Sequence, residues 1–203
     1  MNRLAALATF VSLFAVVGAA RGGEAPSVST DQIGAVTRSA IHQTGNGNQA
    51  TVNQSGSAGD ITLDQSGANN NASATQSGAG YGRAAVNQDG ASNVASLIQS
   101  GGANTVVLGQ SGAGNQASLQ QTALPGGGNL AVLSQTGAMN TASLTQNGDA
   151  NTALQTQIGA GDSQSVVQNG DSNFAAYTQI GNNLPDLSIK QTGGASVTVL
   201  QSH

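Results

Sequence analysis

The chain has 203 residues, a formal net charge of −4, and neither cysteine nor tryptophan. Only 7% of its residues are charged and 2% are aromatic, whereas glycine alone contributes 29 residues. The shortage of aromatics argues against a conventional globular core. The absence of cysteine rules out disulfides as the stabilising element, and the lack of a basic patch argues against a nucleic-acid partner.

The first 20 residues have the layout of a cleaved, Sec-type secretion signal. Arg3 supplies a positive start, residues 4–17 form an apolar run, and Gly18 to Ala20 are small. That order of regions is typical of a signal peptide. The run is short for a membrane span, so a retained anchor is the less favoured reading. We expect cleavage near Ala20, a flexible segment at 21–37, and no stable membrane insertion.

From residue 38 to 203 the sequence repeats with a period of about eleven residues. Such a period identifies a repeat architecture. The three extra residues between Gln121 and Gln135 are expected in an arc between strands, because Pro125 and several glycines lie there. The glutamines that mark the repeat are Gln43, Gln54, Gln65, Gln76, Gln88, Gln99, Gln110, Gln121, Gln135, Gln146, Gln157, Gln168, Gln179, Gln191 and Gln201.

Positions at even offsets before each glutamine share a chemical character. The residue two before is apolar or aromatic in every unit except that of Gln155, and the residue four before is mostly small or apolar. Even offsets share one face of a β-strand, so these columns and the glutamines are predicted to point inward together. Asparagine recurs six before, at Asn48, Asn70, Asn93, Asn104, Asn115, Asn129, Asn140, Asn151 and Asn173.

These patterns predict an all-β fold, a parallel β-solenoid or two-sheet β-helix. Half-coils of about 11 residues would give about 22 residues per coil and about seven coils. A glycine in every unit argues against helix. Stacked amides are expected to donate to the matching amide of the next coil. The two end coils leave backbone donors and acceptors open, so the sequence predicts growth by end-to-end stacking.

The repeat unit resembles the curlin repeat of curli fibre proteins. The pattern Gln-x-Gly-x-x-Asn-x-Ala-x-Leu/Val-x-Gln is present at 110–121 and recurs over about 43–201. The resemblance implies a secreted structural subunit of a functional amyloid fibre, serving biofilm and cell adhesion outside a Gram-negative bacterium. It also implies three partners: further copies of the chain, an outer-membrane export pore and a nucleator. Two kinds of repeat unit alternate along the chain, and asparagine stands six residues before the glutamine in both. This pattern is closer to that of the minor, nucleating curlin subunit. The basic final unit of that subunit is missing here.

The sequence contains few residues of the types that catalysis requires. With His42, His203 and no cysteine, zinc or triad chemistry is not expected, and we predict no enzyme, no cofactor and no metal site. Asp149 and Asp171 lie one coil apart. They are interpreted as charges that slow premature aggregation, with a cation between them as the alternative.

The outer faces suggest two further readings. An apolar stripe of Val107, Val132 and Leu154, with Leu130 and Phe174 nearby, is expected either to bundle fibres laterally or merely to reflect β-propensity. The opposite face carries a column of Ser and Thr, which keeps a monomeric surface-binding solenoid, such as an adhesin or ice-binding protein, as an alternative function. A solenoid enzyme would need acids and bases clustered on one face, and no such cluster is seen.

Overall fold

The computed structural model describes residues 10–17 and 24–203. This part of the chain is built from strands and contains no helix. The strands are β1 (Phe10–Val17), β2 (Ser27–Asn46), β3 (Gln49–Ala68), β4 (Asn71–Ala91), β5 (Val94–Gly101), β6 (Thr105–Ala113), β7 (Gln116–Ala123), β8 (Leu130–Ala138), β9 (Thr141–Asn147), β10 (Thr152–Ala160), β11 (Ser163–Asn169), β12 (Phe174–Asn182), β13 (Leu187–Thr192) and β14 (Ser196–Ser202).

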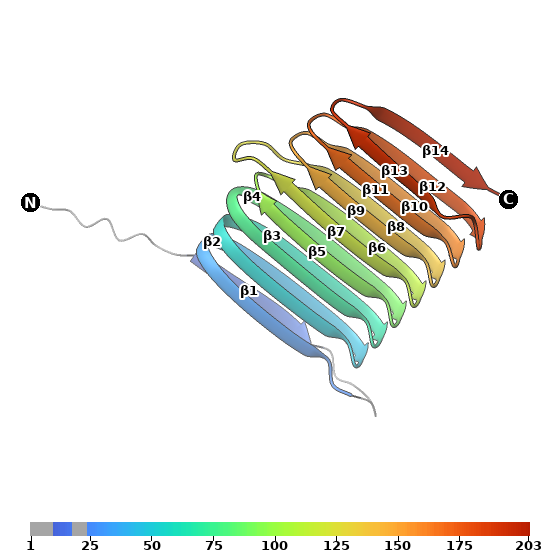
Figure 1. Ribbon diagram of the computed structural model, residues 1–203. Helices are drawn as coiled ribbons and strands as arrows, with labels where there is room; N and C mark the ends of the chain where they lie inside the picture. The colour runs from blue at the N-terminus through green and yellow to red at the C-terminus, as the bar shows by residue number, and fades with distance from the viewer. Residues whose placement is uncertain (1–9, 18–23) are drawn as a thin grey trace, which may run out of the picture.

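The strands wind into a flattened parallel solenoid, as the sequence predicts (Figure 1). The order along the sheet is β13-β11-β9-β7-β5-β4-β6-β8-β10-β12-β14, so from β5 onward odd-numbered strands stack on one side and even-numbered strands on the other. We call these the odd sheet and the even sheet. The long strands β2, β3 and β4 run through both sides, since β4 pairs with β5 through its first half and with β6 through its second. Coils of about 22 residues give about eight turns.

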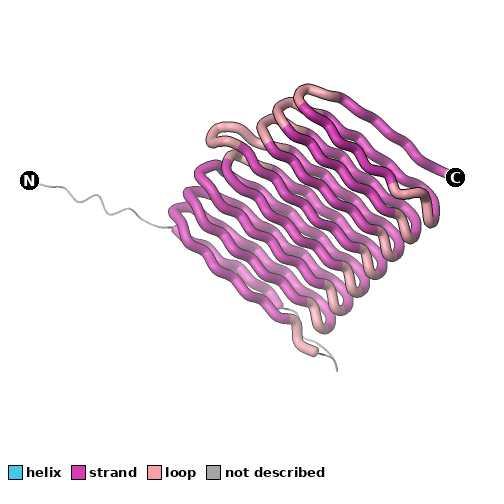
Figure 2. Tube along the Cα trace, viewed as in Figure 1, coloured by secondary structure: helices cyan, strands magenta, loops and turns pink. Residues whose placement is uncertain are grey.

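Insertions leave the stacking register intact because the arcs absorb them. Gln54 pairs with Gln76 at a spacing of 22 residues, whereas Gln110 pairs with Gln135 at a spacing of 25. The residues that separate β7 from β8 lie in the loop of 124–129, drawn as a projecting pink loop in Figure 2. The two flanking strands therefore keep their places in the stack.

The core is one cluster of small and aliphatic side chains between the two sheets. Val52, Leu63, Leu97 and Leu144 are at most 1% exposed, and alanines occupy the neighbouring column. Burial of one Val or Leu side chain contributes roughly 1.5–3 kcal/mol. The inner columns predicted from even sequence offsets are thus the columns that exclude water.

The N-terminal boundary differs from the expectation of a flexible segment at 21–37. The structure begins β2 at Ser27, and residues 27–34 pair in parallel with residues 49–56. Gln32 takes part in this additional coil, since its Nε2 donates to Gln54 Oε1 at 2.6 Å.

The predicted signal peptide falls largely on residues 1–9 and 18–20, outside the described residues. Its central part forms β1, which pairs in parallel with Val36 to Gln43 of β2. Signal cleavage therefore stays a prediction. No helix in the described part of the chain is both long and apolar enough to span a membrane.

Candidate functional site

Two continuous glutamine ladders run through the interior, one along each sheet. In every rung Nε2 donates to Oε1 of the next glutamine toward the C-terminus, with distances of 2.6–3.2 Å. All members are buried except the end rungs Gln32 and Gln201, which are partly exposed. The odd sheet holds Gln32, Gln54, Gln76, Gln99, Gln121, Gln146, Gln168 and Gln191; the even sheet holds Gln43, Gln65, Gln88, Gln110, Gln135, Gln157, Gln179 and Gln201.

The second amide proton of these glutamines ties the two sheets together. Gln110 Nε2 also donates to Val94 O at 3.0 Å, and Gln146 Nε2 to Leu130 O at 3.0 Å. Each of these bonds crosses from one sheet to the backbone of the other. A buried amide with no partner costs about 1–3 kcal/mol, so the ladder makes an amide-lined interior tolerable.

The asparagines combine the predicted amide-to-amide pairing, as where Asn93 Nδ2 donates to Asn70 Oδ1 at 3.1 Å, with bonds to the backbone of the arcs. Asn93 Nδ2 donates to Asp89 O at 3.3 Å and Gly112 O at 3.1 Å, while its backbone N–H donates to Asn70 Oδ1 at 3.0 Å. The asparagine therefore satisfies the backbone of an arc. The set Asn48, Asn70, Asn93, Asn104, Asn115, Asn129, Asn140, Asn151 and Asn173 is at most 3% exposed.

Polar residues interrupt these columns near the C-terminal end. Gln155 stands between Leu133 and Tyr177 in the aliphatic column, Gln164 takes the place of an alanine, and Asp162 takes the place of an asparagine. The side chains of these three residues and of Tyr177 are buried. The atoms Gln155 Oε1, Gln164 Oε1, Asp162 Oδ2 and the Tyr177 hydroxyl have no hydrogen-bond partner. Of these residues, Gln155 stands out in the sequence as the exception in its apolar column. Asp162 could have been found there as well, because it continues the asparagine column.

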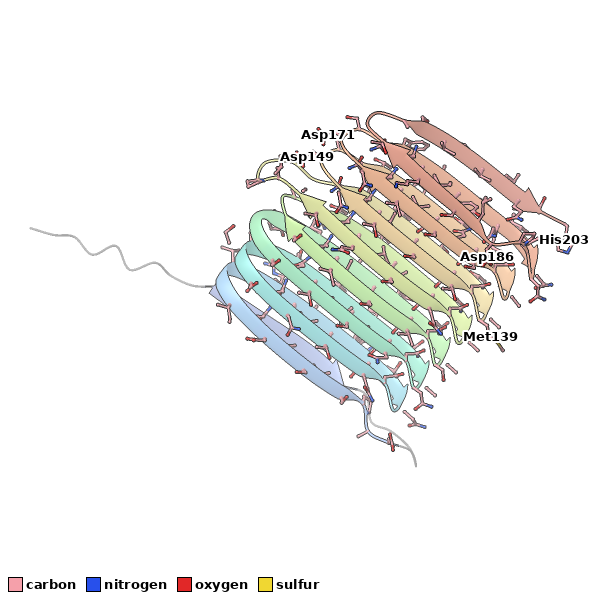
Figure 3. All side chains as sticks on the ribbon, in the orientation of Figure 1. Met139, Asp149, Asp171, Asp186 and His203 are labelled. Carbon is pink, nitrogen blue, oxygen red and sulfur yellow. The ribbon has the colours of Figure 1, made fainter. Side chains whose placement is uncertain are left out.

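Asp149 and Asp171 lie in successive arcs, as expected, and satisfy backbone donors (Figure 3). Asp171 Oδ1 accepts from Asp149 N at 2.8 Å, and Asp149 Oδ1 accepts from Leu124 N at 3.0 Å. The described residues include no group of three or more His, Cys, Asp or Glu side chains that could hold a metal ion. The geometry supports an arc-stabilising role for the two carboxylates.

The outer surface of the even sheet carries the predicted apolar stripe. Val107, Leu130 and Leu154 are 47%, 39% and 36% exposed, and Val132 and Phe174 are half-buried. The register places Val107, Val132 and Leu154 in one column. The odd sheet instead exposes hydroxyl groups such as those of Ser96, Ser118 and Ser143, so the two outer faces differ in chemistry.

The two rims of the solenoid are strand edges. At the C-terminal rim, β13 pairs with β11 and β14 pairs with β12, each on one side within the described chain. At the N-terminal rim, residues 27–34 of β2 pair with β3 on one side, whereas Val36 to Gln43 are covered by β1. Gln43 Oε1 is buried at this rim and has no hydrogen-bond partner. An open edge of this kind is a template for a further strand.

Stacked parallel coils, internal amide ladders and strand edges at both rims define a β-solenoid repeat protein. A family model described as the curlin associated repeat matches residues 125–148, the segment that holds β8 and β9. This match supports the curlin-type resemblance seen in the repeat. No curated protein and no solved structure matches the chain.

Proposed function

We propose that the chain is a structural subunit of an extracellular, curli-type amyloid fibre that scaffolds biofilm and supports adhesion. The observation that carries the proposal is the polarity of the even-sheet ladder. It starts at the unpaired acceptor Gln43 Oε1 and ends at the rim glutamine Gln201. A second copy stacked on the rim supplies the missing donor and continues both backbone ladders.

Removal of β1 is part of this proposal. The register sets Val17 against Gln43, and valine has no side-chain donor for the buried Oε1. Cleavage near Ala20 detaches β1 and opens the edge from Val36 to Gln43. Export through an outer-membrane pore, and assembly started by a nucleator, follow from the curlin-type resemblance and belong to the same proposal.

Fibre diffraction tests the proposal directly. The full chain and the form that begins at Arg21 are purified and incubated under identical conditions. We expect the shorter form to give fibres with a meridional reflection near about 4.7 Å, the spacing between stacked strands. A lasting monomer without that reflection would refute the fibre role. Thermal hysteresis from such a monomer would support a surface-binding solenoid instead.

A nucleating subunit is the second candidate, favoured by the asparagine column in both sheets, as at Asn93 and Asn104. A nucleator would accelerate assembly of a different curlin-type chain when added at a small fraction of its concentration. A fibre subunit would assemble on its own and accelerate mainly copies of itself. Kinetics of the chain alone and in mixtures separate the two roles.

A further inference from the structure

The ends of one outer column carry opposite charges. On the odd sheet, the residues directly before the ladder glutamines stack in the order Asp31, Asn53, Thr75, Ile98, Gln120, Thr145, Val167 and Lys190. Asp31 is the member at the N-terminal rim and Lys190 the member at the C-terminal rim, and both are exposed. Between the two ends the column is uncharged.

We propose that copies of the chain stack head to tail in an unbroken register, in which Lys190 of one copy forms an ion pair with Asp31 of the next. This inference rests on the fibre role proposed above and specifies its junction. In this register β13 of one copy lies beside residues 27–34 of the next copy. Neighbouring strands are about 4.7–4.9 Å apart, a separation that the lysine side chain spans easily.

The amide ladders select the same orientation. Within the chain, each glutamine donates toward the C-terminal rim, as Gln168 does to Gln191 at 2.8 Å and Gln179 to Gln201 at 2.9 Å. Head-to-tail stacking sets Gln201 Nε2 against the buried, unpaired Gln43 Oε1 of the next copy. Stacking two C-terminal rims would instead bring together ladder ends that both present amide donors. Hydrogen-bond direction and charge therefore agree on one polarity.

The other outer columns do not oppose this junction. In the same register Ser196 meets Arg38 of the next copy, and Leu200 meets His42. Asp186 meets Ser27, because both stand five positions before their ladder glutamines. Among the residues that the structure describes, no like charges are brought together across the stack, and the Lys190–Asp31 contact is the single attractive pair of opposite charges.

Charge reversal in the form that begins at Arg21 tests the ion pair. Lys190→Glu alone and Asp31→Lys alone each place like charges at every junction. We expect either variant to elongate its own seeds roughly threefold to tenfold more slowly at low salt, the size of effect that an exposed pair produces. The double variant restores the wild-type rate. At about 1 M salt the differences vanish because screening acts within about 3 Å.

Mixing the two single variants tests polarity as well as pairing. In an alternating head-to-tail fibre, Glu at 190 meets Lys at 31, and Lys190 meets Asp31, so every junction is attractive. We expect an equimolar mixture to assemble near the wild-type rate into fibres containing both chains in a 1:1 ratio. Gln120→Glu, in the interior of the same column, is the control and leaves elongation unchanged.

The outcomes separate this inference from the fibre role. If wild-type chains form no fibres, the proposed function fails. If fibres form, but the single reversals elongate normally or the mixture stays as slow as its components, the Lys190–Asp31 junction is overturned while the fibre role stands. A slowed Gln120→Glu variant would also overturn it, because the effect would then belong to surface charge in general.

Discussion

Gln110 Nε2 donates to Gln135 Oε1 at 2.8 Å, although the two residues are 25 positions apart instead of the usual 22. The extra residues are confined to the loop between β7 and β8, so the rung forms as in any other coil. The ladder thus depends on which side chain reaches the interior column. It tolerates arcs of different length.

Two glutamines on β10 offer a matched test of the ladder. Gln157 accepts from Gln135 at 2.8 Å and donates to Gln179 at 3.2 Å, whereas Gln155 Oε1 is buried without a partner in the aliphatic column. Gln157→Leu is expected to destabilise the chain by about 2–5 kcal/mol, because two buried amides lose partners. Gln155→Leu is expected to stabilise it by about 1–2 kcal/mol.

Urea denaturation of both variants under monomeric conditions measures the difference. The same substitution is made at two positions that lie two residues apart on one strand. Helix or strand propensity therefore cannot explain changes of opposite sign in the free energy of unfolding. Equal effects at the two positions would contradict the ladder as a source of stability.

Asp162→Asn is expected to stabilise the chain by about 1–3 kcal/mol, the cost of an unsatisfied buried polar group. Asp162 Oδ1 already takes the role of an asparagine oxygen, accepting from Leu184 N at 2.9 Å, but Oδ2 has no partner. In the preceding coil Asn140 Nδ2 donates to Gly159 O at 3.0 Å. An asparagine at 162 would supply the equivalent donor.

Thermal or urea unfolding measures the change, with Asp171→Asn as the control. Asp171 is exposed and its Oδ1 already accepts from Asp149 N, so loss of its charge leaves no buried atom better satisfied. Equal stabilisation by both variants would assign the effect to net charge.

Most ladder glutamines are followed two residues later by a glycine that the stacking of the coils requires. Gly112 has φ of 112°, and a Cβ there would overlap Gly137 O in the next coil. Gly112→Ala is expected to cost at least about 2–3 kcal/mol through backbone strain and overlap. Gly109→Ala, on the same strand with open space around the position, is expected to stabilise by about 0.4–1 kcal/mol. Denaturation midpoints that fall equally would contradict this stacking.

Stability should fall at high pH because of one buried phenol. Burial, with a smaller contribution from the charge of Asp186, raises the pKa of Tyr177 from 10.0 to about 12. The folded chain then holds the proton that the unfolded chain releases, so the contribution is complete below pH 10 and is lost as the pH rises toward about 12. Unfolding free energies measured from pH 9 to 12 should decline, and Tyr177→Phe should flatten that decline.

The inner face of the solenoid could be predicted from the sequence alone. Asparagine, alanine, leucine or valine, and glutamine recur at even offsets, and a strand turns even offsets to one side. Gln146, Gln157 and Gln168 accordingly lie inside, each at 0% exposure. The same spacing of residue types predicts the period, the coil length and the two chemically different outer faces. Strand geometry leaves no other arrangement for a repeat with that spacing.

Only the tertiary structure decided how those columns are used. Which atoms meet between coils decides the direction of each Gln–Gln bond and the bonds that Asn93 makes to the carbonyls of an arc. It also decides that Gln32 joins the stack. Sequence spacing sets the column of a residue and leaves the orientation of its amide open. The opposition of Asp31 and Lys190 likewise emerges once eight half-coils are stacked in register, because charges 159 residues apart share a column only through the fold.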